Sequence, residues 1–164
     1  MIAGNLRRHK AEYVYRLPDS QKFNLYGVGY EKQNKNNICY HGSFDPDELP
    51  FVLEGSFGLV WDGDSAETCS GVYGQYLKVN NPHKCSLYLA TGLPVIVWKE
   101  SAVARIVKKQ KLGLTVNSLH EIPEQIHSLT EAEYQEIFKN VRKYAEKLRS
   151  GACLQMAVSK ALNR

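Results

Sequence analysis

The sequence lacks any apolar run of about 18 residues, the length needed to cross a membrane, and it carries no signal peptide. Its four cysteines have no C-x-x-C spacing and no paired Cys/His cluster, which argues against a structural zinc site. Internal repeats and low-complexity tracts are also absent. We therefore expect a soluble domain in the cytoplasm with reduced thiols, either free or peripheral at the inner face of the membrane.

A strong excess of one charge is missing as well. The chain has 21 Lys and Arg against 17 Asp and Glu, for a net charge of +4. Nucleic-acid binding proteins usually carry a clustered basic face, so no nucleic-acid partner is expected. The mild positive excess suits a small anionic ligand or a loose contact with an acidic membrane surface.

What the sequence does contain is a regular alternation of strand and helix patterns. With 164 residues and 43% hydrophobic residues, it predicts a single domain with a substantial core. Alternating strands and helices favour an α/β fold, a parallel sheet covered on both faces. The expected strands are residues 1–5, 23–30, 38–40, 57–61, 95–98 and 114–116. The expected helices are residues 10–16, 82–90, 102–109, 118–129 and 152–162, and a further helix is expected to start at 45–49. Residues 62–76 are expected to form a long loop. A capping box at 130–133 is expected to begin a long amphipathic helix.

The segment NNPHKCSLYLATGLPVIVW is the most informative part of the chain. Asn81 is expected to cap a helix whose first residue is Pro82, and Gly92 is expected to end it in a left-handed conformation. Residues 95–98 then form a buried parallel strand. Lys84 falls in the first helical turn, where free N–H groups and the helix dipole attract anions. This pattern predicts a phosphate site.

Ligands of open parallel sheets bind beyond the carboxyl ends of the strands, and the first such loop holds Asn5, Arg7 and Arg8. Gly4 allows the backbone to approach a ligand closely, and an arginine guanidinium can form paired hydrogen bonds with a diphosphate. These three residues are therefore candidate ligand contacts. The alternative is two solvated arginines before a helix.

The next two loops offer an aromatic wall and paired carboxylates. Tyr40 could wall in a flat pyrimidine, or it could belong to the core beside an ordinary turn. His41, alone in that turn, is interpreted as a surface residue. The stretch 62–65 (DGDS) could serve metal binding or acid–base chemistry, but Asp-Gly is also common turn chemistry.

The fourth polar stretch leads into the helix of the informative segment. Here Lys84 would neutralise a diphosphate, and Asn80 and Asn81 would orient phosphate or ribose, with Tyr76 beside them. The alternative is a solvated basic stretch with a simple helix cap. No residue is assigned a catalytic role.

The same segment resembles a family signature, P-x-K-x-x-E-Y-L-A-x-G-x-P-V-I, of nucleotide-sugar glycosyltransferases with the two-domain GT-B fold. One position departs, because Leu87 stands where the family has a Glu that commonly contacts the ribose. More narrowly, FGLVWDGDS and GVYGQYLKVNNPHK resemble bacterial glucosyltransferase- and galactofuranosyltransferase-like enzymes, including those that extend glycans on serine-rich adhesins. The resemblance covers roughly residues 2–128. Matching signature positions are Pro82, Lys84, Tyr88, Leu89, Ala90, Gly92, Pro94, Val95 and Ile96.

The resemblance implies a Rossmann-like doubly wound parallel sheet, the C-terminal half of a GT-B fold, with helices from about 130 to 164 lying against it. The opening residues read as the end of a strand, so we expect residues 1–164 to be the donor-binding domain of a longer hexosyltransferase. Its acceptor domain, which would hold the glycan or glycoprotein acceptor, lies outside this sequence. A UDP-glucose-like donor, no metal or other cofactor, a possible homo-oligomer and little activity of the domain by itself are further expectations. The alternatives are a UDP-sugar epimerase on the same scaffold and a non-catalytic nucleotide-sugar-binding or assembly module.

Overall fold

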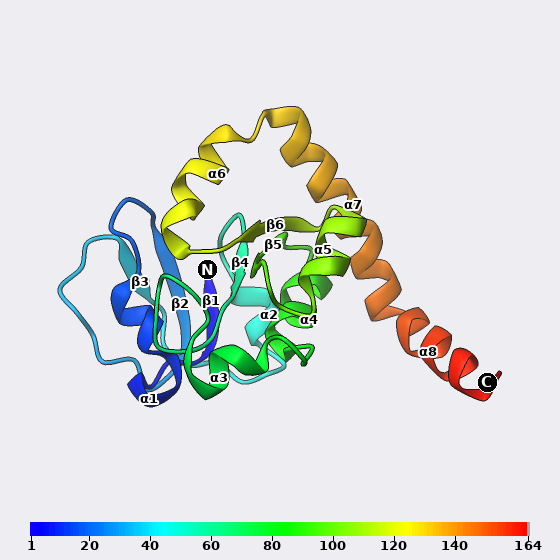
Figure 1. Cartoon of the computed structure of the whole chain (residues 1–164), viewed down its shortest axis with the longest axis horizontal. Coiled ribbons are helices and arrows are strands. Elements are labelled where there is room, and N and C mark those ends of the chain that lie inside the picture. Colours follow the sequence, from blue (N-terminus) through cyan, green and yellow to red (C-terminus); the bar gives the residue numbers. More distant parts are fainter. Residues whose placement is uncertain (164) are drawn as a thin grey trace.

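The computed structural model describes residues 1–163 and has an α/β architecture (Figure 1). Two three-stranded sheets, both entirely parallel, have the orders β1-β2-β3 and β4-β5-β6. The strands of these sheets are β1 (Ile2–Asn5), β2 (Phe23–Val28), β3 (Ile38–Tyr40), β4 (Gly58–Val60), β5 (Val95–Trp98) and β6 (Gly113–Val116).

A narrow seam joins the two sheets between β1 and β4. The Met1 nitrogen donates to the Phe57 carbonyl at 2.7 Å, and the Leu59 N–H donates to the Met1 carbonyl at 2.9 Å. Read through this seam, the strand order is β3-β2-β1-β4-β5-β6, the order of the doubly wound Rossmann fold. The predicted fold class is confirmed.

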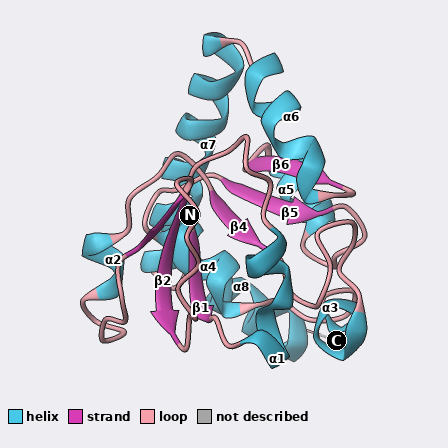
Figure 2. Ribbon diagram, turned by 90° about the vertical axis from the view of Figure 1, so that its left-hand side faces the viewer, coloured by secondary structure: helices cyan, strands magenta, loops and turns pink. Residues whose placement is uncertain are grey.

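Alternate residues of the strands feed two separate hydrophobic clusters, one on each face. Leu59 and Trp61 point to one face and Val60 to the other. The first face is covered by segments around α1, η1, η2 and α6, and the second by α4, α5 and α7, an arrangement that Figures 1 and 2 show from two sides. The helices are α1 (Arg8–Ala11), η1 (3-10, Glu12–Arg16), α2 (Leu49–Val52), α3 (Gly71–Tyr76), α4 (His83–Ala90), α5 (Ala104–Gln110), η2 (3-10, Leu119–Glu121), α6 (Ile122–Ser128), α7 (Glu131–Arg149) and α8 (Ala152–Leu162).

The start of α4 differs from the prediction by one residue. Pro82 occupies the N-cap position with an extended backbone (φ −68°, ψ 137°), and α4 begins at His83. No side chain caps the helix, so the expectation that Asn81 is the cap is wrong. Because the extended ψ of Pro82 places the turn into the helix one residue later, Lys84 is the second helical residue.

The end of α4 is as predicted. Gly92 has φ +85°, the left-handed conformation that glycine adopts without strain. The Leu93 N–H donates to the Tyr88 carbonyl at 2.9 Å and the Gly92 N–H to the Leu89 carbonyl at 3.1 Å. This pair of bonds is a Schellman motif, which satisfies carbonyls at the end of the helix and directs the chain into β5.

Several predicted boundaries shift. The helix predicted at 10–16 is α1 followed by η1, and the helix predicted at 118–129 is η2 followed by α6. Ser118 caps η2, and Pro123 suits the first turn of a new α-helix, so the second segment begins again there. Residues 46–48 of the 45–49 stretch form a turn, and α2 begins at Leu49, the last residue of that stretch. Helix α3 lies inside the predicted loop 62–76 and starts at Gly71, whose φ is +70°.

The two C-terminal helices behave differently. Helix α7 starts with the predicted capping box at Thr130 and buries Ile137, Val141 and Ala145 in the second hydrophobic cluster. Helix α8 has no buried residue and extends away from the body of the molecule (Figure 1). The expectation that the terminal helices lie against the sheet therefore holds for α7 and is wrong for α8. No helix within residues 1–163 is both long and apolar enough to span a membrane.

Candidate functional site

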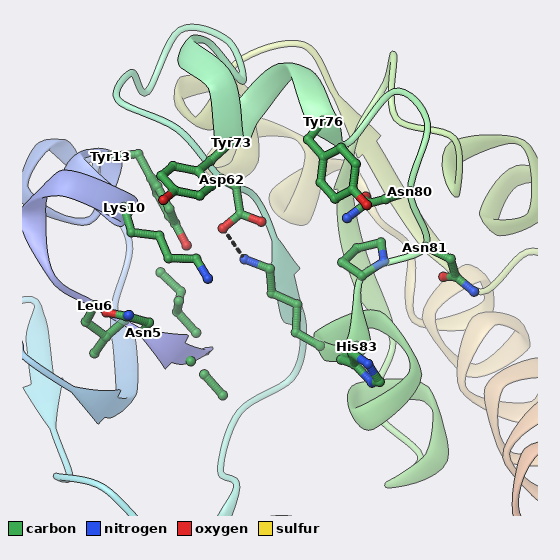
Figure 3. Close-up of a pocket in the computed structure, with 15 residues that line it drawn as sticks. Asn5, Leu6, Lys10, Tyr13, Asp62, Tyr73, Tyr76, Asn80, Asn81 and His83 are labelled. Atoms are coloured by element: carbon green, nitrogen blue, oxygen red, sulfur yellow. Dashed lines mark hydrogen bonds and ion pairs between the residues drawn. The ribbon is translucent and has the colours of Figure 1, made fainter.

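A cavity lies at the seam, beyond the carboxyl ends of β1 and β4 (Figure 3). Its volume is about 740 Å³, and its walls come from the end of β1, helix α1, the loop after β4, helix α3 and the start of α4. In doubly wound sheets this switch in strand order is where ligands bind. The cavity is therefore the candidate ligand site.

Lys84 is anchored on one wall of this cavity. Its ammonium nitrogen lies 2.8 Å from Oδ1 of Asp62 and donates to the Trp61 carbonyl at 2.5 Å. The Lys84 and Asp62 side chains are 16% and 18% exposed. Two of the three ammonium hydrogens have partners within the chain, and one remains for a ligand.

Lys10 brings a second ammonium to the same cavity from α1 (Figure 3). Its nitrogen lies 5.6 Å from the centre of the Tyr73 ring, within the range of a cation–π contact. Among the ion pairs found in residues 1–163, none involves Lys10. Lys10 is therefore an ammonium without an ion-pair partner among these residues.

Aromatic side chains surround these charges. Tyr73 and Tyr76, on α3, are 46% and 59% exposed and line the cavity mouth. Tyr13 is buried in the wall, and burial together with the nearby Asp62 charge raises its pKa well above the usual value. Its hydroxyl therefore stays protonated and able to donate a hydrogen bond.

The structure brings most of the sequence-predicted residues to this cavity. One of them, Asn5, also accepts a hydrogen bond from the Arg7 N–H at 3.1 Å. The Oδ1 atom of Asn80 is buried and has no hydrogen-bond partner among the described residues. The predicted residues that line the cavity are Asn5, Tyr76, Asn80, Asn81 and Lys84.

The other three predicted residues lie outside it. Arg8 turns toward Glu31, at 2.9 Å, and its guanidinium stacks 4.1 Å from the centre of the Tyr15 ring. The Arg7 side chain packs over Gly29. The Tyr40 hydroxyl donates to the Gly27 carbonyl at 2.8 Å. Local partners therefore hold these side chains away from the cavity, and their part in binding stays a prediction.

Sequence reasoning missed Lys10, Tyr13, Tyr73 and His83, which all line the cavity. Lys10 and Tyr13 lie in the segment just after β1, where a ligand contact is expected, but the adjacent arginines are the residue type that the sequence pattern favours for a diphosphate. Tyr73 has no sequence signal because the pattern of residues 62–76 predicts a loop and not helix α3. No cluster of three or more metal-ligating side chains occurs in residues 1–163. The expectation that no metal takes part stays a prediction.

A parallel sheet of this strand order, with a charged cavity at the switch point, defines the chain as a Rossmann-like α/β domain. It belongs to the family described as "Glucosyltransferase 3-like, C-terminal domain", which matches residues 1–161. The resemblance seen in the sequence is thereby confirmed.

Three relatives extend the comparison. The chain is 45% identical over 154 residues to "Beta-1,6-galactofuranosyltransferase WbbI" of Escherichia coli (strain K12). The aligned region covers 93% of this chain and 46% of that protein. It is 32% identical over 153 residues to "Glucosyltransferase 3" of Streptococcus gordonii, covering 92% of this chain and 44% of the relative. It is 34% identical over 121 residues to "Glucosyltransferase 3" of Streptococcus parasanguinis, covering 73% of this chain and 33% of the relative. The chain thus spans less than half the length of each of these glycosyltransferases.

Proposed function

We propose that the cavity binds the diphosphate of a nucleotide-sugar donor, a UDP-hexose, as part of a glycosyltransferase. The observation that carries the proposal is the meeting of two ammonium groups, Lys10 and Lys84, with the start of α4 at the switch point of the sheet. Each lysine lies on a different side of the seam, so a diphosphate between them would be held from both sides. Free N–H groups at the start of α4 add to the attraction for an anion.

In this proposal the domain stabilises the leaving group. An acceptor hydroxyl oxygen forms a bond to the sugar C1 while the bond from C1 to the diphosphate oxygen breaks, and the diphosphate leaves with the electron pair. Lys10 and Lys84 stabilise the negative charge that develops there. The hydroxyl proton would pass to a base outside this chain, on the acceptor-binding side. The exposed rings of Tyr73 and Tyr76 offer flat surfaces for the base or the sugar.

The relatives support transfer over the epimerase alternative, because all three are named as transferases. Their names include both a galactofuranosyl- and a glucosyltransferase, and the donor hexose we propose is one of these two sugars. The acceptor we propose is a hydroxyl of a glycan or glycoprotein. A cytoplasmic location at or near the inner face of the membrane completes the proposal, and the four unpaired cysteines agree with it.

The first test is calorimetric titration of the chain with UDP. Lys10→Met and Lys84→Met should each weaken UDP binding about tenfold, which corresponds to about 1.4 kcal/mol, because each removes one charge facing the diphosphate. Lys32→Met is the matched control, since Lys32 is exposed and does not line the cavity. GDP, which has the same diphosphate on a different nucleobase, is the control for selectivity toward uracil.

The proposal would be wrong if UDP bound with equal affinity to all four proteins, since the site would then lie elsewhere. If the chain failed to bind UDP, the same titration of the full-length enzyme would follow. Failure there too would reject UDP as the nucleotide.

A further inference from the structure

One feature of the cavity opposes the binding of an anion. Asp62, at the carboxyl end of β4, is the one carboxylate among the residues that line it, and its side chain is only 18% exposed. A phosphate bound to Lys84 would lie within a few ångströms of this carboxylate, because the two side chains are 2.8 Å apart. At such distances like charges repel strongly when water is largely excluded.

Orientation of Lys84 does not by itself require the negative charge. The Trp61 carbonyl already accepts one hydrogen bond from the ammonium, and a neutral amide oxygen at position 62 could accept the second. A site built only to hold a diphosphate tightly would have such a neutral acceptor. The carboxylate therefore brings a negative charge to the cavity that the hydrogen bond to Lys84 does not need.

We propose that Asp62 is a counter-charge that weakens the hold of the cavity on the released nucleoside diphosphate. This inference rests on the proposed function. With Asp62 ionised, Lys84 presents only part of its charge, and Lys10 is the ammonium that acts at full strength. Product release limits the turnover of many enzymes, so a site that binds its leaving group less tightly turns over faster.

The test replaces the charge and keeps the shape. Asp62→Asn should bind UDP about tenfold more tightly than the unchanged chain, because the amide oxygen still accepts from Lys84 while the repulsion is gone. Uridine, which has no phosphate, should bind both proteins with equal affinity. The affinity gain for UDP should shrink as salt is added, since screening weakens charge effects.

Asp64→Asn is the matched control. Asp64 is two residues further along the same loop, is exposed, pairs with the Ser70 hydroxyl and does not line the cavity. Its replacement should change UDP affinity less than twofold. Circular dichroism of each variant checks that the fold is intact.

A second variant separates a counter-charge from a purely orienting role. In a Lys84→Met background, Asp62→Asn should still strengthen UDP binding, because the repulsion does not depend on Lys84. Weaker or unchanged UDP binding by Asp62→Asn, alone or in that background, would overturn the inference while leaving the proposed function standing. Absence of UDP binding by the unchanged full-length enzyme would instead defeat the proposed function.

Discussion

Tyr88 illustrates how one signature residue serves the fold. Its hydroxyl accepts a hydrogen bond at 2.7 Å from the Ala3 N–H, in the strand next to the seam. Its ring lies against Gly58, where an added Cβ would approach ring atoms to 2.3 Å. The ring is fully buried, and burial raises the pKa of the phenol. The tyrosine thus satisfies a backbone group of β1 from a helix on the β4 side.

Tyr88→Phe should therefore lower the free energy of unfolding by about 1–3 kcal/mol, the cost of leaving a buried N–H without an acceptor. Urea denaturation followed by circular dichroism measures the change. Tyr76→Phe, at an exposed ring, is the control and should be neutral within about 0.5 kcal/mol. A loss for Tyr88→Phe no larger than that of the control would mean that the Ala3 N–H finds another partner.

The cysteines differ sharply in their surroundings. Burial raises the pKa of Cys85 to about 11 and that of Cys69 to about 12, so both stay protonated at neutral pH. Cys85 lies near the start of α4, where a thiol pKa is often lowered, but here it is a packing residue of the second hydrophobic cluster. Cys39, by contrast, is exposed.

Iodoacetamide at pH 8 should accordingly modify Cys39 at least tenfold faster than Cys69 or Cys85, because reaction requires an accessible thiolate. Peptide mass spectrometry over time gives the three rates. In urea the difference should vanish. Fast labelling of Cys85 in the folded protein would show that α4 opens readily.

At the scale of elements, helix α7 shows how strongly local sequence can determine a boundary. Oγ1 of Thr130 accepts from the Glu133 N–H at 3.3 Å, and the Glu133 carboxylate accepts from the Thr130 N–H at 2.9 Å. The Thr130 hydroxyl also donates to that carboxylate, at 2.7 Å, and the two hydrogen bonds that Thr130 donates to it lower the pKa of Glu133 below its ordinary value of 4.5. The carboxylate therefore stabilises the fold fully above pH 4.5, and this contribution is lost as the pH falls through the lowered value.

Thr130→Ala should cost about 1 kcal/mol of unfolding free energy at pH 7, and Thr130→Ser should cost much less because it keeps the capping oxygen. The difference in unfolding free energy between Thr130→Ala and the unchanged chain should become smaller below pH 4, as Glu133 becomes protonated. Denaturant titrations at several pH values measure both effects. A constant difference down to pH 3 would contradict the role of Glu133.

Elements with such local signals could be predicted from the sequence. Helix α8 matches its prediction at both ends, with Gly151 at φ +73° before it, and the Gly92 stop of α4 is equally clear. Helix α3 could not be found, because its glycines and polar neighbours are typical of loops. A contact distant in sequence holds its end, because the Ala102 N–H donates to the carbonyl of Leu77, the residue after α3, at 2.9 Å.

At the scale of the whole molecule, the strand ends that carry the site could be predicted, but not the side chains that turn toward it. The order of a parallel sheet brings the ends of β1 and β4 together, so Asn5 and Lys84 meet in one cavity. Whether an arginine reaches that cavity depends on competing partners elsewhere in the fold. Arg8 pairs with Glu31, 23 residues away, and sequence spacing gives no sign of that contact.

The seam between the two sheets lies beneath the candidate cavity. Lys10 follows β1 on one side of it, and Lys84 follows β4 on the other, while two backbone hydrogen bonds at Met1 connect these strands. A diphosphate bound by both lysines would connect the two sheets in addition to these backbone hydrogen bonds. Part of its binding free energy then goes into stiffening the domain, and the loaded protein should be the more rigid body.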